Sequence, residues 1–352
     1  MDSSQSLVDT YLDRAVEEFD TNHLAPRLIR RLAEDVPGLF LSSALRHLKT
    51  TVKSNALRFL TTVAIRQEAM FEYLTSPHAS SRDNAVNLFR RFLDIDPSFD
   101  VKLAERLPNR RESNLLDALD SIHTTRALDI LDQTSRGRRL LPILGHLPGY
   151  RDNRISAKAT LFVGRRIQNP LWTRKQLVQP DQRVRANAVE SLWGLDSPAA
   201  VDLLEECAGD VNNRVLGNSL LGLHLLGRSE VERRVFALSE TGKYEFRSTA
   251  AWILGKMSGE ECIHRLTLLV KDDHPQVRST ALRALIEIRR AIARTPQAVA
   301  ARAAHADAEA AARAVETALQ SIQEDPGRTA IDVRLDGASF GAAYTVVRSR
   351  GR

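Results

Sequence analysis

The chain has 352 residues, only 5% aromatic residues and a formal net charge of +6. Because strands favour β-branched and aromatic residues, this composition indicates helices rather than sheets. Met1–Ser6 lack the basic and apolar stretches of a secretory signal, and no apolar run approaches the roughly 18 residues of a membrane span. We therefore expect a soluble, cytoplasmic protein that does not enter the membrane.

An amphipathic acidic helix is predicted first, over residues 7–19, with Leu12, Ala15 and Phe19 on its apolar face. We interpret residues 1–23 as a capping helix in front of a repeat array over residues 24–292. The first units of this array are weak. Val52–Ala56 and Ser81–Ala85 resemble the clearer repeats that follow, but the register is lost between residues 94 and 150. Helices are expected there at about 111–120, 124–133 and 137–147, one more than regular pairing requires.

Clear internal repeats occupy residues 150–290. Five short sequence motifs recur there, which we call marks. Their second residues, at positions 154, 185, 216, 247 and 278, are 31 residues apart. Apolar residues at helical spacing follow each mark, then a short break and a second amphipathic stretch. Each unit is predicted to be helix A, turn, helix B, turn, with neighbouring units stacked because one helical pair cannot bury its own apolar face.

These marks share a Val-Arg-x-x-Ala core, as in Val184–Ala188 and Val277–Ala281. The pattern resembles HEAT repeats, and most closely the short bacterial HEAT-like repeats named after phycobilisome lyase subunits. The resemblance implies an all-α solenoid and commonly a scaffold or binding role, without one particular activity. Leu216 departs from it, since an arginine usually occupies that position. We interpret the repeated arginine as a structural ladder that binds turn carboxylates or carbonyls between repeats.

The composition changes after Ile292. An alanine-rich helix is predicted over residues 293–325, and residues 326–352 alternate like short β-strands. Two short strands are not stable alone. This β-like tail is expected either to dock on the last repeats or to begin a β-rich domain.

Three motifs that could carry chemistry are interpreted as structural. Gly337–Gly341 has the G-x-S-x-G form, but no acid or histidine follows it to complete a hydrolase triad. The acidic segment 94–105 lacks the central glycine of a calcium loop and is read as an inter-helix turn. Cys207 and Cys262 are expected to be reduced core thiols. We therefore predict a protein that is not an enzyme and has no catalytic, cofactor-binding or metal-binding residues.

The B helices of HEAT solenoids usually line the concave face, so their outward residues are the candidate partner-binding surface. Basic and acidic positions alternate along these helices, with Asp202, Glu205 and Glu206 interrupting the basic ones. A mixed-charge groove favours a protein or peptide partner. The candidate contact residues are Trp172, Arg174, Lys175, Arg233, Arg234, His264 and Arg265.

Two alternatives remain open. The segment 133–180 holds ten basic residues and one acid, which is typical of a surface that binds nucleic acid or another polyanion, including in a HEAT-type DNA-repair protein. Its anion-binding candidates are Arg136, Arg138, Arg139, Arg165 and Arg166. The other alternative, a lyase-like chaperone subunit, depends on the family resemblance alone.

Overall fold

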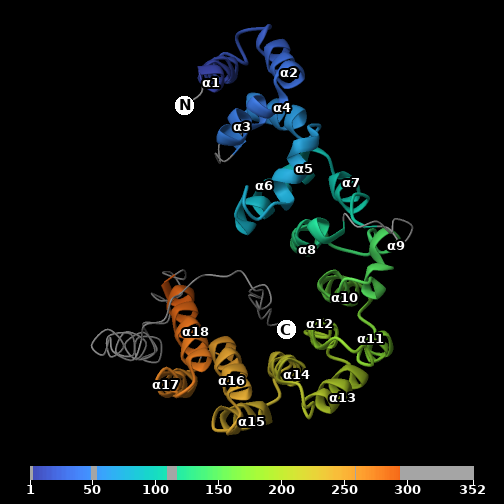
Figure 1. The fold of residues 1–352 in the computed structure, drawn as a ribbon, viewed down its shortest axis with the longest axis vertical. Coiled ribbons are helices and arrows are strands. Elements are labelled where there is room, and N and C mark those ends of the chain that lie inside the picture. The colour runs from blue at the N-terminus through green and yellow to red at the C-terminus, as the bar shows by residue number, and fades with distance from the viewer. Residues whose placement is uncertain (1–2, 49–53, 109–116, 258, 294–352) are drawn as a thin grey trace, which may run out of the picture. The chain divides into compact units, whose positions relative to one another are not determined.

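The computed structural model describes residues 3–48, 54–108, 117–257 and 259–293, and every regular element in these ranges is a helix (Figure 1). The described helices fall into two compact units, Met1–Arg228 (unit 1) and Ser229–Arg352 (unit 2). No helix in this part of the chain has both the length and the apolar character needed to cross a membrane.

The first part of unit 1 precedes the clear repeats. Its elements are α1 (Ser3–Glu17), α2 (Ala25–Asp35), α3 (Pro37–Leu48), α4 (Asn55–Ala64), α5 (Glu68–Thr75), α6 (Arg82–Ile95), α7 (Phe99–Ala104), α8 (Asp117–Thr134), α9 (Leu141–Leu144) and the 3-10 turn η1 (Leu147–Gly149). The helix expected over residues 7–19 corresponds to α1, which packs against α2 and α3. Leu12 and Ala15 of α1 are buried in an apolar cluster that continues to Val163. One continuous core therefore joins α1 to the first clear repeat.

The predicted alternation of A and B helices is confirmed over the clear repeats. Unit 1 contains α10 (Asn153–Ile167), α11 (Pro170–Gln176), α12 (Gln182–Glu190), α13 (Pro198–Cys207) and α14 (Asn213–Leu225); unit 2 contains α15 (Glu230–Ser239), α16 (Tyr244–Met257), α17 (Glu260–Leu269) and α18 (Pro275–Ala293). In unit 1, α12 packs between α10 and α14, while α11 packs against α13 (Figure 1). In unit 2, α16 packs against α18 and α15 against α17.

Short polar side chains fix where the helices of unit 1 begin. The cap residue of each helix from α10 to α14 accepts a hydrogen bond from a backbone N–H of the first turn, and these residues are Asp152, Asn169, Asp181, Ser197 and Asn212. Capping satisfies N–H groups that have no partner inside the helix.

The described helices between residues 94 and 150 differ in their bounds from the three predicted ones. The two helices predicted near 111–120 and 124–133 are wrong as separate elements, because α8 is continuous from Asp117 to Thr134. No glycine or proline interrupts that stretch. The helix predicted over 137–147 is reduced to the four residues of α9, followed by η1. Gly137, with a φ of 82°, lies before α9, and Pro148 lies in η1.

Two A-helix glycines allow close packing between successive A helices. A Cβ atom at Gly164 of α10 would lie 2.6 Å from the Cβ of Ser191, and one at Gly255 of α16 would lie 2.6 Å from the Cβ of Ala284. These separations are shorter than van der Waals contact. The next A helix can therefore pack this closely only because the glycine has no side chain.

Three predictions lie outside the described residues. They are the alanine-rich helix over 293–325 beyond Ala293, the β-like tail over 326–352 and the turn at Gly337–Gly341.

Candidate functional site

The repeated arginine binds backbone carbonyls in the turn that precedes its own A helix. Nη1 of Arg185, Arg247 and Arg278 donates to the carbonyl oxygens of the residues five and six positions earlier, whereas Arg154 is exposed and makes no such bond. Arg185 contacts Pro180 and Gln179 at 2.9 and 3.0 Å. Arg247 and Arg278 make the equivalent pairs of bonds at 2.9 to 3.1 Å. The predicted ladder is thus confirmed at three of its positions, with carbonyls as the recurring partners.

The turn aspartates have a different role from the one expected. Four aspartates just before the marks are possible partners of the ladder arginines: Asp152, Asp181, Asp210 and Asp272. Only Asp272 pairs with one, accepting from Arg247 Nε and Nη2 at 2.7 and 2.9 Å. Asp152 and Asp181 instead accept backbone N–H groups at the start of the following A helix, and Asp210 accepts the N–H of Asn212, the cap residue of α14. Carboxylates one or two residues before a helix are well placed to cap it, which explains the difference.

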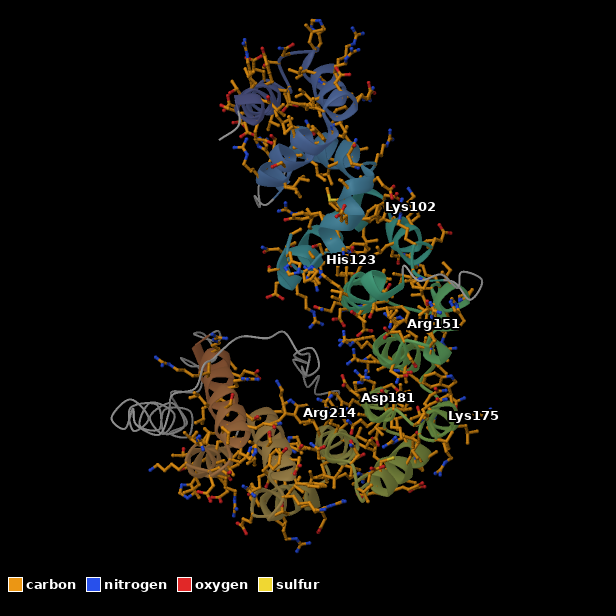
Figure 2. The ribbon with its side chains drawn as sticks, viewed as in Figure 1. Lys102, His123, Arg151, Lys175, Asp181 and Arg214 are labelled. Carbon is orange, nitrogen blue, oxygen red and sulfur yellow. The ribbon has the colours of Figure 1, made fainter. Side chains whose placement is uncertain are left out.

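The candidate contacts of α11 form a mixed surface with α13. Arg174 is paired with Glu206 across the two helices, with Nη2 to Oε2 at 2.7 Å, and the hydrogen bond to Glu206 raises the pKa of Arg174. Lys175 is exposed, and Figure 2 shows it on the side of α11 away from α12. Trp172 is half-buried and packs against the core beside Gly164. Leu171, which the sequence did not single out, is 70% exposed.

The candidate contacts of unit 2 are also engaged within the chain. Arg233 of α15 pairs with Glu230 of the same helix. Arg265 of α17 pairs with Glu240 at 2.7 Å and Glu261 at 3.0 Å, and its guanidinium lies 4.3 Å from the centre of the Phe236 ring. Arg234 is half-buried and His264 is exposed. These residues share a B-helix surface on which opposite charges alternate.

Two of the anion-binding candidates, Arg138 and Arg139, connect the turn before α9 to neighbouring segments by hydrogen bonds. Arg138 donates from Nε to the carbonyl oxygen of Arg166 at 2.9 Å. Arg139 pairs with Asp100, whose side chain is fully buried in α7, at 2.7 Å, and also donates to the carbonyl oxygen of Pro97. A buried carboxylate is costly without a charged partner. Arg139 therefore contributes directly to the packing of α7.

Arg165 and Arg166 lie in an ion-pair network between α8, α10 and α12. Arg166 is 8% exposed, pairs with Asp132 at 2.9 Å and stacks 3.4 Å from the centre of the Phe162 ring. Arg165 is 15% exposed and bridges Asp132 and Glu190, the latter at 2.8 Å. Burial raises the pKa of Glu190 although the Arg165 charge opposes this effect. Little of either guanidinium remains accessible to an external anion.

Arg136 is exposed in the turn before α9, as Arg138 and Arg139 are, but it differs from the other four anion-binding candidates because it makes no hydrogen bond or ion pair with the described residues. The high positive charge of segment 133–180 is therefore mostly used in contacts within the fold. Sequence reasoning could not show this, because the acidic partners Asp100, Asp129 and Asp132 precede the basic segment. Lys158, for example, pairs with Asp129 at 2.6 Å.

The acidic turn expected within residues 94–105 lies between α6 and α7. Asp96 accepts from Lys102 Nζ at 2.7 Å and from Ser98 Oγ at 2.6 Å. These bonds lower the pKa of Asp96 to about 2. Among the described residues, no group of three or more His, Cys, Asp or Glu is arranged to hold a metal ion. Cys207 and Cys262 are buried free thiols, and burial raises the pKa of each.

A cavity of about 630 Å³, which the sequence did not indicate, lies beside this turn. Ile65, Phe71 and Ile95 supply apolar walls. Two of its cations have partners in the chain: Lys102 pairs with Asp96, and Arg106 pairs with Glu68 and stacks 3.9 Å from the Phe71 ring centre. The repeats are weakest here, so no spacing in the sequence identified these residues as neighbours.

Stacked A and B helices within each unit, joined by repeated arginine–carbonyl bonds, define a helical-repeat protein. The family model of HEAT repeats matches residues 231–320, which supports a HEAT-repeat protein. No curated protein matches the chain. The bacterial source and the phycobilisome-lyase type of repeat remain predictions from the sequence.

Proposed function

We propose that this chain is a non-catalytic scaffold that binds a protein or peptide partner on the surface of its helical pairs. HEAT repeats commonly mediate protein interactions, and a repeat match extends over most of the described part of unit 2. The main support for the proposal is the surface shared by α11 and α13, which presents both apolar and charged side chains. It combines the exposed Leu171 with Lys175 and with the Arg174–Glu206 pair, which is half-exposed on both sides. Such a surface suits a partner with apolar and charged groups of both signs.

The polyanion alternative has less support. A groove that follows a nucleic-acid backbone needs several accessible cations in a row. Four of the five candidates donate to carboxylates or carbonyls of the fold, and only Arg136 is exposed without such a contact among those five. The lyase-like alternative is favoured by one observation, the cavity beside α7, whose volume suits a small molecule. Its paired cations leave it less able to bind an anionic ligand.

Pull-down with the full chain tests the proposal. The bait would be the wild-type protein and a Leu171→Ser, Lys175→Ser variant, with captured protein and nucleic acid measured at low and high salt. We expect one or more proteins to remain bound to the wild type at high salt and to be depleted on the variant. Captured nucleic acid that disappears steeply with salt would favour the polyanion alternative. Equal capture of every protein by both baits would contradict the proposed surface.

A further inference from the structure

Two valines are exposed in the turns that lead into consecutive A helices of unit 1. Val178 precedes α12 and is 82% exposed, and Val211 precedes α14 and is 91% exposed. They are the most exposed large apolar residues in the described part of the chain. Turns usually hold glycine, asparagine, aspartate, serine or proline, so a β-branched residue is unusual there. Single exposed apolar residues need no explanation, but these two lie 33 residues apart in the turns before successive A helices.

The two turns are held side by side. The Asn212 amide, directly after Val211, donates to Gln182 Oε1 at the start of α12. The preceding turn leads into α10, which packs against α12. Figure 2 shows Arg151, Asp181 and Arg214 following one another along unit 1. We name this surface the turn edge and define it by Arg154, Val178, Gln182, Arg183, Val211 and Arg214.

The charge of the turn edge is positive at the surface. Residues 150–154, 177–185 and 208–214 together contain five arginines and three aspartates, a net charge of +2. The aspartates turn toward the backbone: Asp152 and Asp181 each accept an N–H group of the next helix, and Asp210 accepts the N–H of the cap residue Asn212, at 2.7 or 2.8 Å. Arg154 and Arg214 are exposed, and Arg183 is 41% exposed despite its bond to Asp181. The turn edge therefore combines two exposed valines with exposed guanidinium groups.

We infer that the turn edge of unit 1 is a docking surface for an acidic segment of a partner protein that also carries apolar side chains. The arginines complement the carboxylates of such a segment, and its apolar side chains cover Val178 and Val211. A nucleic acid would satisfy the arginines but would gain nothing from two exposed valines, so the observations favour a protein. The inference depends on the proposed function and adds to it the location and chemistry of one contact surface.

The experiment is an unbiased peptide selection. A random peptide library displayed on phage is selected against the immobilised full chain, and enriched peptides are synthesised. Their Kd is measured by fluorescence anisotropy for four proteins. These are the wild type, the double variant Val178→Ser and Val211→Ser, a Leu171→Ser variant of the α11 and α13 surface, and a Leu24→Ser control, whose exposed leucine lies outside both surfaces. We expect enriched peptides to combine Asp or Glu with Leu, Ile or Phe. We expect the double variant to weaken their binding about tenfold, as for contacts central to an interface, and the control to change it less than twofold.

The outcomes separate this inference from the proposed function. Enriched peptides that lose affinity on Leu171→Ser but bind the double variant normally would overturn the turn-edge inference and leave the scaffold proposal standing. Enrichment of basic peptides would overturn the inference as well. Tight, salt-sensitive binding of a labelled dT oligonucleotide that is unchanged by the valine substitutions, with no peptide enriched, would contradict both. Failure to enrich any peptide would also count against both. Circular dichroism would verify that the variants are folded, which the exposure of both valines leads us to expect.

Discussion

Arg247 of α16 and Asp272, in the turn before α18, form a bidentate ion pair between two successive helical pairs of unit 2. The two side chains are 17% and 8% exposed. The same guanidinium donates to two carbonyl oxygens of its own preceding turn, those of Thr241 and Gly242. One side chain therefore links its own turn to the next one. The pKa of Asp272 is lowered: burial acts to raise it, but bonds from Arg247 and from the His274 N–H outweigh burial.

Replacing Arg247 with methionine should destabilise unit 2. The change leaves Asp272 without its guanidinium and two turn carbonyls without a donor. We expect a loss of about 2 to 3 kcal/mol, measured from urea unfolding by circular dichroism. Asp272→Asn should cost less, because an amide can still accept the His274 N–H bond. The two changes combined should cost less than their sum, and strict additivity would contradict a direct interaction.

The Arg165–Glu190 pair leads to a second prediction, in unit 1. Glu190 is buried and its pKa is raised, so its charge is tolerated mainly because Arg165 lies 2.8 Å away. Arg165→Met should therefore lower stability at pH 7 by about 3 kcal/mol. Glu190→Gln alone should be nearly neutral, because a carboxyl group with a raised pKa weakens the fold as pH increases through that pKa.

The double variant Arg165→Met, Glu190→Gln provides the check. Without a buried charge to compensate, it should recover more than half of the stability lost in Arg165→Met. Asp132 retains Arg166 as a partner in every variant. If the double variant is as unstable as the single one, the cost comes from lost packing of the arginine stem rather than from an unpaired carboxylate.

The helices of the clear repeats could be predicted because their information is local. The marks at positions 154, 185, 216, 247 and 278 all lie in the first turns of A helices, and the apolar spacing after each mark reports a buried face. The irregular region was harder, since α9 and η1 are too short for helical spacing to define them. Position 216 shows that the fold tolerates loss of one ladder arginine.

The candidate surfaces could be predicted only as sets of exposed B-helix positions. Arg139 was grouped with Arg136 because both belong to one basic segment, yet its partner Asp100 lies 39 residues earlier. An ion pair between residues this far apart in the sequence depends on how α7 and the turn before α9 pack together. The periodicity of the sequence carries no information about that packing. The exposed valines of the turn edge were missed for the opposite reason, since an isolated apolar residue in a turn has no pattern.

Arg136 and Arg139 should respond differently to the same substitution. Arg139→Gln removes the charged partner of the fully buried Asp100 and should cost about 2 to 4 kcal/mol in urea unfolding. Arg136→Gln, at an exposed turn position, should change stability by less than about 0.5 kcal/mol. If both variants are equally stable, Arg139 is not a structural residue and returns as an anion-binding candidate.

Acid stability should depend on the Asp96–Lys102 pair. The pKa of Asp96 is lowered to about 2, first by the Lys102 hydrogen bond and then by Ser98. A lowered carboxyl pKa stabilises the fold above the unfolded pKa of about 3.8, and this contribution is lost as pH falls toward 2. Lys102→Met should therefore lower stability by about 1 kcal/mol at pH 7, the small value reflecting an ammonium that is 55% exposed.

The pH profile of Lys102→Met distinguishes this cause from lost packing. Its deficit relative to the wild type should shrink between pH 4 and pH 2, because protonation of Asp96 removes from the wild type the interaction that the variant already lacks. Thermal unfolding at several pH values measures this difference. A deficit that is constant over the whole range would show that the lysine stem, rather than its charge, is responsible.

Gly255→Ala should separate α16 from α18 although alanine is the better helix former. In an exposed helix this substitution stabilises by up to about 1 kcal/mol. Here the new methyl group would lie 2.6 Å from the Ala284 Cβ and 3.1 Å from its Cα, so the backbones themselves must move. We expect a net loss of about 1 to 3 kcal/mol, measured from urea unfolding.

Gly242→Ala, where nothing lies within 4 Å of the added carbon, is the control and should be within about 0.5 kcal/mol of the wild type. A stabilising effect of Gly255→Ala would mean that α16 and α18 can separate freely, and the packing of successive A helices would then contribute little to unit 2.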